Sequence, residues 1–329
     1  MSVLAVLEQR GGAWNRASFE TLAAAQQIAR ELNATAMAAV LGDAIDPLAG
    51  ELAGKELAQV YAVEHELLKN YTPDAFTIAL RQLVESAKPT LVLFPHTYQV
   101  RDFLPKLATS LGTVAVSDVV SHRVEGATLV LVRQLFQGKV NADVRFCDGA
   151  PHFASLQAGA YRADRLAAAA GSPAPIEKVT PQLSPADIRT RPLELFRESE
   201  RAVDLGAAEM IVSVGRGIQE ADNIPLVEKL AKALGAELAA SRPICDAGWL
   251  PMERQVGSSG QTVAPKLYMA IGISGAIQHL VGMKGSRVVV AVNKDANAPI
   301  FEMADYGIVG DLFQVVPELI AAIEKSKGS

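Results

Sequence analysis

The chain has 329 residues, of which 50% are hydrophobic and 20% charged, and its formal net charge is −5. This much apolar material excludes a disordered chain and suffices for about two domains, while the negative charge gives no bulk electrostatic case for binding nucleic acid or an anionic membrane surface. Two cysteines, Cys147 and Cys245, are too few for a disulfide framework or a zinc site, and they fit a reducing compartment.

Residues 1–10 predict a short strand and not a signal peptide, because they lack a basic start and a long apolar region. No uncharged apolar run further along the chain reaches the ~18 residues that suggest a spanning helix. We therefore expect a cytoplasmic protein without direct membrane insertion.

The first half of the chain alternates predicted strands and helices. Ser18 is the expected N-cap of a helix that continues to about Leu32, and Asp74 that of a helix that runs through Ala87 and stops at Pro89. A third helix is expected at about 103–111. Apolar runs predict the strands, at 3–7, 36–41, 60–63, 90–94 and 114–116. The alternation indicates a largely parallel sheet with helices on its faces.

From residue 124 the pattern changes to strands with no long helix between them. They are expected at 128–133, 140–146 and 152–157, and they predict an antiparallel extension of the sheet. Between about 170 and 200 the composition shifts to proline, serine and charge, which indicates an extended, semi-rigid linker. We therefore expect an N-terminal α/β domain over residues 1–190 and a C-terminal domain over residues 200–329.

The C-terminal domain restarts the alternation. Its strands are expected at 210–214, 237–239, 267–271, 287–292 and 307–309. Its helices are expected at 224–234, at 274–281 and in a final segment that ends near Ile323, with Pro317 close to its first turn. The fold class is thus predicted as α/β, with two doubly wound, Rossmann-like domains. In such sheets ligands bind outside the carboxyl ends of the strands.

Two glycine-containing turns follow strands of this second domain. Gly215-Arg216-Gly217 would let backbone N–H groups approach a phosphate, with a fixed positive charge from Arg216, although ordinary strand-to-helix turns look the same. Ile271-Gly-Ile-Ser-Gly275 ends a strand and precedes a predicted helix. The amides of Ser274, Gly275 and Ala276 would then be free to bind a pyrophosphate, unless Ser274 is simply an N-cap.

Other polar positions carry weaker signals. Asn293 and Asp311 each follow a strand, where such groups can hold ribose hydroxyls, but Asp311 is equally a natural cap for the last helix. Ser258 and Ser259 fall in a predicted loop, where they would bond the edge of a ring or merely turn the chain. His96 lies in a polar loop without metal-ligand spacing, which favours a structural or interface role.

The sequence contains no recognisable catalytic constellation. It lacks paired carboxylates, a P-loop and a defensible Ser/His or Cys/His pair, so we predict no catalytic and no metal-binding residues. The Gly-x-Gly-x-x-Gly fingerprint after the first strand is missing as well, because Gly11-Gly12 does not fit it.

Taken in order, the motifs from Val214 to Val315 resemble the alpha subunits of electron transfer flavoproteins. The earlier segments Leu93-Phe-Pro-His-Thr97, Arg101-Asp102 and Ser117-Asp118-Val119 match as well, so the resemblance covers essentially the whole chain. It implies a heterodimer with an electron transfer flavoprotein beta subunit, one FAD held mainly by the C-terminal domain, and AMP in the beta subunit of the commoner type.

The resemblance further implies a carrier and not an enzyme. Electrons arrive from acyl-CoA and related dehydrogenases, as in fatty acid β-oxidation. They leave one at a time for a membrane quinone oxidoreductase, through an anionic semiquinone. Redox chemistry of this kind belongs to the cofactor, and no general base is needed because no substrate proton is removed.

The residues that would hold FAD follow from the same resemblance. Arg216 matches the arginine of the first glycine turn, and Arg242 in the Ser241-Arg242 pair matches the arginine over the flavin ring. Ser259 stands where many members have a threonine whose hydroxyl reaches flavin N5, and it keeps that hydroxyl. The other matches are the ring-edge loop (Val256, Gly257, Ser258), the pyrophosphate helix (Ser274, Gly275, Ala276, Ile277, Gln278 on the ribityl side, and His279 near the C2 carbonyl) and the adenosine end (Asn293, Asp311, Leu312). Arg242 and His279 would place positive charge or hydrogen-bond donors where reduction makes the flavin negative.

Three alternatives remain open. A bifurcating complex would carry a second FAD in the beta subunit and oxidise NADH. A nicotinamide-dependent dehydrogenase would need a proton-transfer residue beside the nicotinamide. A non-catalytic adenine-nucleotide binding module would purify as a colourless protein.

Overall fold

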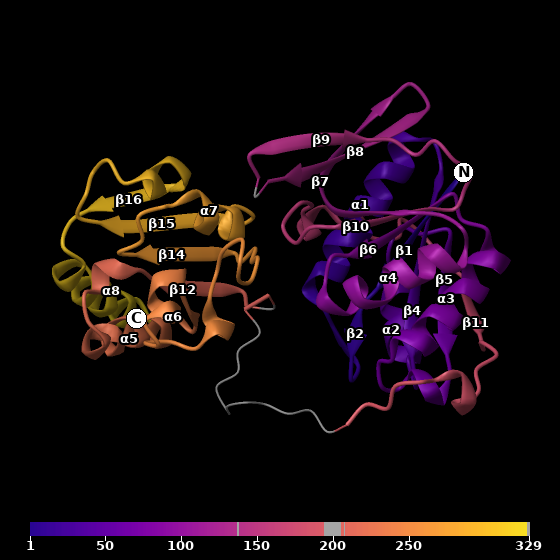
Figure 1. Cartoon of the computed structure of the whole chain (residues 1–329), viewed down its shortest axis with the longest axis horizontal. Helices are drawn as coiled ribbons and strands as arrows, with labels where there is room; N and C mark the ends of the chain where they lie inside the picture. The colour runs from indigo at the N-terminus through magenta and orange to yellow at the C-terminus, as the bar shows by residue number, and fades with distance from the viewer. Residues whose placement is uncertain (137, 194–204, 207, 328–329) are drawn as a thin grey trace. The chain divides into compact units, whose positions relative to one another are not determined.

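The computed structural model describes residues 1–136, 138–193, 205–206 and 208–327. The chain forms two compact units, Met1–Leu195 and Phe196–Ser329. Each unit is a sheet covered by helices (Figure 1). The α/β fold class predicted from the sequence is confirmed.

Within the described residues, the first unit contains one nine-stranded sheet and a two-stranded hairpin. The sheet has the order β11-β5-β4-β1-β6-β10-β7-β8-β9, and β7, β8 and β9 pair antiparallel while the other neighbours pair parallel. The strands of the sheet are β1 (Ser2–Leu7), β4 (Thr35–Gly42), β5 (Gln59–Glu64), β6 (Leu91–Pro95), β7 (Ala115–Glu125), β8 (Thr128–Leu135), β9 (Val140–Val144), β10 (His152–Leu156) and β11 (Ile176–Val179). The hairpin pairs β2 (Gln9–Arg10) with β3 (Ala13–Trp14).

Alternating side chains divide the core of the first unit into two layers. In β1, Val3 and Ala5 pack on one face of the sheet, while Leu4 and Val6 pack on the other. The first layer contains side chains of α1 (Arg16–Glu31) and α2 (Asp46–Ala53), and the second those of α3 (Pro73–Ala87) and α4 (Tyr98–Ser110). The central strands are buried on both faces, which is why their sequences are almost continuously apolar.

Two helix caps differ from the predictions. Asn15 caps α1 through its side chain, which accepts from the Ala17 amide, whereas the Ser18 hydroxyl is bonded to the backbone N–H and C=O of Glu8 at 2.8 and 2.9 Å. Thr72 caps α3, and Asp74 lies inside its first turn. Both expected caps are therefore wrong, by three and two positions. In each helix a residue earlier in the chain provides the side-chain oxygen that accepts from a first-turn amide.

The antiparallel extension consists of β7, β8 and β9, but β10 does not belong to it. That strand lies between β6 and β7 and pairs parallel with both. The expected linker is also corrected, because β11 pairs parallel with β5 inside the range 170–200. Gln182 exchanges two hydrogen bonds with the Gln82 side chain, and Arg189 binds Asp74. The described part of that segment therefore packs on the first unit, and residues 194–200 of the expected linker lie outside the described residues.

In its described residues, the second unit contains a five-stranded sheet in the order β13-β12-β14-β15-β16, and all its pairings are parallel. The strands are β12 (Met210–Val214), β13 (Glu237–Ala240), β14 (Leu267–Ile271), β15 (Val288–Asn293) and β16 (Tyr306–Val309). Helices α5 (Ile224–Leu234) and α8 (Leu312–Lys327) share one core layer with α6 (Arg242–Asp246). On the other face, α7 (Ile277–Met283) packs with the loop that precedes β14.

Two helices of this unit begin elsewhere than predicted. The segment expected as a helix from Ser274 becomes helical only at Ile277, and Ala276 takes the cap position, so Ser274 is not an N-cap. The last helix begins at Leu312 and reaches Lys327, which puts Pro317 inside it and not near its first turn. Pro317 lacks the N–H that would continue the helical hydrogen bonds at this point.

Candidate cofactor site at the carboxyl edge of the second sheet

All five parallel strands of the second unit end at one edge of the sheet. Val214 lies beside Ala240 on one neighbouring strand and beside Ile271 on the other, and Asn293 lies beside Val309. From β12 the chain continues to β13 on one side, and from β14 it continues to β15 on the other. The order of the strands thus reverses between β12 and β14, and in open α/β sheets this is where ligands bind.

Glycines let the two turns at this reversal approach closely. The Gly215 and Gly217 amides donate to Ile271 O at 2.9 Å and to Gly272 O at 3.0 Å. A Cβ atom on Gly217 would lie 2.7 Å from Gly272 Cα, and Gly272 itself has φ +64°. Larger residues would therefore separate the turns that follow the two strands.

The turn between β14 and α7 presents free backbone donors at the same edge. Within the described part of the chain, the N–H groups of Ser274, Gly275 and Ala276 donate to no protein acceptor. Ser274 O accepts from the Ile300 amide at 3.1 Å, which fixes the turn from the other side. Three adjacent free amides can bind an anion such as a pyrophosphate.

The loop that precedes β14 is fixed between β13 and α7. The Val256 amide donates to Ala240 O at 2.9 Å, and the Ser258 amide donates to Gln278 O at 2.7 Å. The Gln255 side-chain amide donates to Ser259 Oγ at 2.9 Å, while Gln255 Oε1 is buried without a partner among the described residues. Because Ser259 Oγ accepts this bond, its own hydrogen is free to be donated outward.

His279 lies under this loop, in α7, and only 6% of it is exposed. Its Nε2 is 2.9 Å from the Tyr268 hydroxyl, whereas its Nδ1 is buried with no partner within the described residues. Burial lowers the pKa of His279 to about 4, with a smaller opposing effect from the Val256 backbone. At neutral pH the imidazole is therefore uncharged, so it can offer a hydrogen bond but not the positive charge that we also considered.

The two arginines of the predicted site are exposed. Arg242 Nε lies 3.1 Å from Asp246 Oδ2, one turn further along α6, and the Arg242 side chain is 67% exposed. Arg216 follows β12 and is exposed as well. Ser241 is buried, and its amide donates to Val214 O at 3.0 Å, which ties the end of β13 to the end of β12. An exposed ion pair of the Arg242–Asp246 kind is weak, so Arg242 can exchange partners.

The residues expected at the adenosine end have structural partners. Asn293 Nδ2 donates to Ile273 O at 2.9 Å, and Asn293 Oδ1 accepts from the Asp295 amide at 2.9 Å. Asp311 Oδ1 accepts from the Phe313 amide at 2.9 Å, as a helix cap does. Leu312 is buried beside Gly272. The structure therefore places these three residues at the same edge of the sheet, and it supports the capping interpretation of Asp311.

All sixteen predicted site residues thus lie at the carboxyl edge of the second sheet, in its turns and loops or in α6, α7 and α8. The structure adds three side chains that the sequence did not single out: Gln255, Asp246 and Tyr268. Asp246 was detectable as an acidic residue four positions after Arg242. Tyr268 was detectable only as the single aromatic residue of its strand, and its contact with His279 depends on the tertiary fold.

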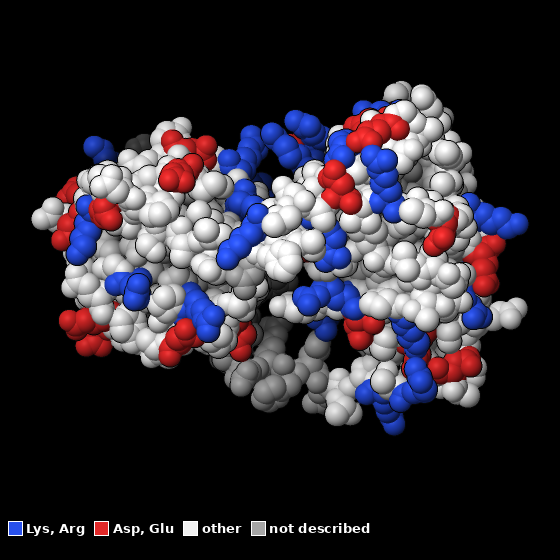
Figure 2. Space-filling model, turned by 45° about the horizontal axis from the view of Figure 1, so that its top comes forward, with Lys and Arg blue, Asp and Glu red and all other residues white. Residues whose placement is uncertain are grey.

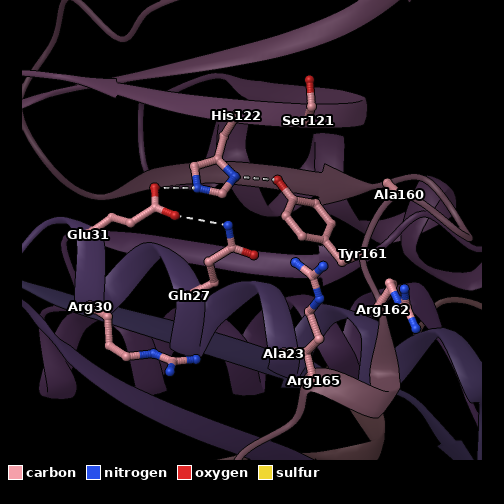
Figure 3. Close-up of a pocket in the computed structure, with 10 residues that line it drawn as sticks. All are labelled: Ala23, Gln27, Arg30, Glu31, Ser121, His122, Ala160, Tyr161, Arg162 and Arg165. Atoms are coloured by element: carbon pink, nitrogen blue, oxygen red, sulfur yellow. Dashed lines mark hydrogen bonds and ion pairs between the residues drawn. The ribbon is translucent and has the colours of Figure 1, made fainter.

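The first unit has a separate cavity of about 760 Å³, which none of the predicted site residues lines (Figure 3). His122 lies between Glu31 and Tyr161 there, with Nε2 3.0 Å from Glu31 Oε2 and Nδ1 2.8 Å from the Tyr161 hydroxyl. His96 of the same unit bonds Ser155 Oγ at 2.9 Å, which agrees with the structural role inferred for it. These histidines are satisfied by protein partners.

Neither a cluster of metal ligands nor a membrane-spanning helix occurs among the described residues. No group of three or more His, Cys, Asp or Glu side chains among them could hold a metal ion. None of the helices described is long and apolar enough to cross a membrane. Side chains of both signs occur on the visible surface of each unit (Figure 2).

Comparisons with known proteins match both units of the chain to one family. Residues 3–184 match the electron transfer flavoprotein domain, and residues 204–284 match the electron transfer flavoprotein FAD-binding domain. The second match includes the site from Arg216 to His279 but not Asn293, Asp311 or Leu312.

Curated relatives match almost the whole chain. The electron transfer flavoprotein subunit alpha of Thermoanaerobacterium thermosaccharolyticum is 38% identical over 322 residues, which cover 97% of each chain. The subunit alpha of Bacillus subtilis is 37% identical over 318 residues, covering 96% of this chain and 95% of that one. A protein of Anaerotignum propionicum called acryloyl-CoA reductase electron transfer subunit beta is 35% identical, covering 98% of this chain and 95% of its own length.

Proposed function

Because the chain belongs to the electron transfer flavoprotein family as an alpha subunit, we propose that its second unit holds one FAD along the carboxyl edge of β12–β16. The observation that carries this proposal is a set of unsatisfied polar groups at that edge. Three adjacent backbone amides, His279 Nδ1 and Gln255 Oε1 lack protein partners in the described chain. A flavin dinucleotide offers acceptors for the donors and a donor for the amide oxygen, so the residues present fit the group.

Different residues of this edge would bind different parts of the cofactor. The amides of Ser274, Gly275 and Ala276 would bind the pyrophosphate, and Arg216 would add a positive charge from the neighbouring turn. Asn293, Asp311 and Leu312 would hold the adenosine, and Gln278 the ribityl chain. The loop of Val256, Gly257, Ser258 and Ser259 would follow the ring edge, with Arg242 over the ring and Ser241 and Ile277 beside it. His279 would donate a hydrogen bond to the C2 carbonyl.

The bound flavin would supply one-electron chemistry. The protein would supply donors that are already in place where negative charge develops, which stabilises the reduced ring without reorganisation. We propose that an anionic semiquinone accumulates for this reason. We also propose a heterodimer with a beta subunit, contacted by the first unit and carrying AMP.

In this proposal electrons come from acyl-CoA and related dehydrogenases, as in fatty acid β-oxidation, and pass to a membrane quinone oxidoreductase. The cytoplasmic location stays a prediction from the sequence. The bifurcating type, with a second FAD in the beta subunit and NADH as donor, is the alternative.

The test is anaerobic reduction of the heterodimer. The chain is co-expressed with its beta subunit, the complex is purified, its flavin and AMP contents are measured, and dithionite is added stepwise while visible spectra are recorded. One FAD and a red species before full reduction support the proposal. A second flavin that NADH reduces would favour the bifurcating type, and a colourless complex would contradict FAD binding.

A further inference from the structure

Tyr268 and His279 form a buried pair behind the candidate flavin site. Tyr268 is 0% exposed in β14, and its hydroxyl is 2.9 Å from His279 Nε2. The two rings are tilted at 59° with centroids 6.1 Å apart, so they meet through this bond and not by stacking. The other ring nitrogen, Nδ1, has no partner among the described residues.

The protonation of both groups limits how this bond can be made. Burial raises the pKa of the Tyr268 hydroxyl, so the phenol keeps its proton, and burial lowers the pKa of His279 to about 4, so the imidazole is neutral. A phenol has one hydrogen, and a neutral imidazole has one donor and one acceptor nitrogen. The pair therefore has two possible arrangements, which differ in the ring nitrogen that carries the hydrogen.

In the first arrangement the Tyr268 hydroxyl donates to Nε2, and Nδ1 carries the hydrogen. In the second, Nε2–H donates to the Tyr268 oxygen, and the phenol hydrogen needs another acceptor. Ser213, on the neighbouring strand and on the same face of the sheet, has a buried hydroxyl. Burial raises the pKa of Tyr268 and the Ser213 side chain lowers it, as a hydroxyl that donates to the phenol oxygen does, so Ser213 does not supply the acceptor that the second arrangement needs. A hydrogen donated by Ser213 leaves the Tyr268 hydrogen for Nε2, so the imidazole hydrogen lies on Nδ1, as in the first arrangement.

We propose that Tyr268 is a positioning residue that holds His279 as the neutral Nδ1–H tautomer and so makes it a hydrogen-bond donor toward the flavin ring. This inference rests on the proposed function, because the acceptor is the cofactor proposed above. The tautomer itself is a property of the chain and can be measured independently of electron transfer. The Tyr268 hydroxyl is bonded to His279 Nε2, so its effect on the flavin would be exerted through that ring.

The first readout is the tautomer. The complete complex, labelled with ¹⁵N-histidine, is studied by two-bond ¹H–¹⁵N NMR, which distinguishes a protonated Nδ1 from a protonated Nε2; His279→Gln identifies the signal. In the unmodified chain we expect a single tautomer with the hydrogen on Nδ1. In Tyr268→Phe, which keeps the ring and removes only the hydroxyl, we expect a mixture. A hydrogen on Nε2 in the unmodified chain would overturn the proposal even if the variant failed to fold.

Two control variants separate the alternatives. Ser213→Ala should leave the His279 tautomer unchanged, and a change of tautomer in this variant would support the arrangement through Ser213 and contradict ours. Tyr161→Phe removes the hydroxyl of the other buried tyrosine–histidine pair, with His122 in the first unit, where the bond is 2.8 Å long (Figure 3). It should leave both His279 and the flavin unaffected.

The second readout is the reduction equilibrium of the bound flavin. In Tyr268→Phe we expect the equilibrium constant for the first electron to fall by about threefold to tenfold, the size expected when one hydrogen bond to a charged group is weakened. An unchanged equilibrium with a changed tautomer would show that His279 does not donate to the ring. If the unmodified complex binds no FAD, the proposed function fails, whereas the tautomer measurement still decides the role of Tyr268.

Discussion

The side chain of Arg242 has two competing partners if the proposed site is correct. In the structure it is paired with Asp246 at 3.1 Å, and the resemblance places it over the flavin ring. Pairs this exposed contribute little to stability, so the guanidinium can turn to a new negative charge at small cost. Arg242 would therefore act through electrostatics and not by holding the fold together.

This role predicts the outcome of Arg242→Ala. The equilibrium constant for the first electron should fall by about tenfold, because one nearby positive charge is lost, while FAD remains bound. Lys266→Ala is the matched control, since it removes a cation with a similarly exposed pair at the amino end of β14. Equal behaviour of the two variants in a spectroscopic redox titration would remove Arg242 from the site.

Asp74 is a buried charge that binds Arg189 on the first unit. Its side chain is 5% exposed and accepts from Arg189 Nη2 and the Arg189 amide, both at 2.9 Å, and from Lys106 Nζ. The hydrogen bonds from Arg189 and then Lys106 hold the pKa of Asp74 well below its ordinary value. The stabilisation is thus complete above pH ~4, the pKa range of the unfolded chain, and is lost as the pH falls toward the folded-state pKa.

Asp74→Asn should lower the free energy of unfolding by about 1–3 kcal/mol at pH 7, because charge-assisted hydrogen bonds become neutral ones. The difference from the unmodified chain should shrink below pH ~4, where Asp74 becomes protonated in the unfolded state of the unmodified chain. Urea unfolding at several pH values measures this, with Asp46→Asn, which removes the exposed Asp46–Lys178 pair, as a control of little effect. A difference that is independent of pH would contradict the account.

At the scale of elements, the β14–α7 turn depends on Gly275. This residue has φ +86°, and a Cβ atom there would collide with the backbone of Ile300, lying 2.6 Å from its Cα. The collision involves backbone on both sides, so a rotamer change cannot relieve it. The positions of the free amides therefore depend on a backbone conformation and a close contact that only glycine allows at residue 275.

Gly275→Ala should destabilise the second unit by about 2–4 kcal/mol and reduce FAD occupancy, since strain and overpacking add. Gly235→Ala is the control: Gly235 has φ +72° at the end of α5 but open space around it, so only the backbone strain of about 1–2 kcal/mol applies. Chemical unfolding and flavin content of both variants test this. Equal losses would mean that the contact with Ile300 does not control the turn.

The sequence predicted those elements whose signals are local. The strands β12 and β14 were located to the residue, because each is an apolar run followed by a glycine turn. The short helix α2 was missed, since eight residues show too little periodicity. The pairing of β10 and of β11 was not predictable either, because partners far apart in the chain decide it.

The same distinction applies to the site. Residues that follow strands were identified because parallel strands bring their carboxyl ends together, whatever lies between them in the chain. The contact between Tyr268 and His279 was not predicted, nor was the neutral state of His279. Both depend on burial under the loop of Val256, which only the folded unit provides.

At the scale of the whole molecule, each unit has its own core layers and its own sheet. The candidate cofactor site lies entirely in the second unit. Binding of FAD should therefore stabilise that unit directly, by an amount that grows with the ratio of free FAD to its dissociation constant. The first unit, with its antiparallel extension of β7, β8 and β9, is left for the proposed contact with the beta subunit.

The most direct test of this account is the stepwise anaerobic reduction of the co-purified heterodimer, with its FAD counted beforehand. We predict one FAD for each chain, and a red one-electron species that forms before full reduction and is diminished in Arg242→Ala. A heterodimer without flavin, or one whose single flavin takes up two electrons with no intermediate, would contradict the central claim that this edge of the sheet stabilises a one-electron carrier.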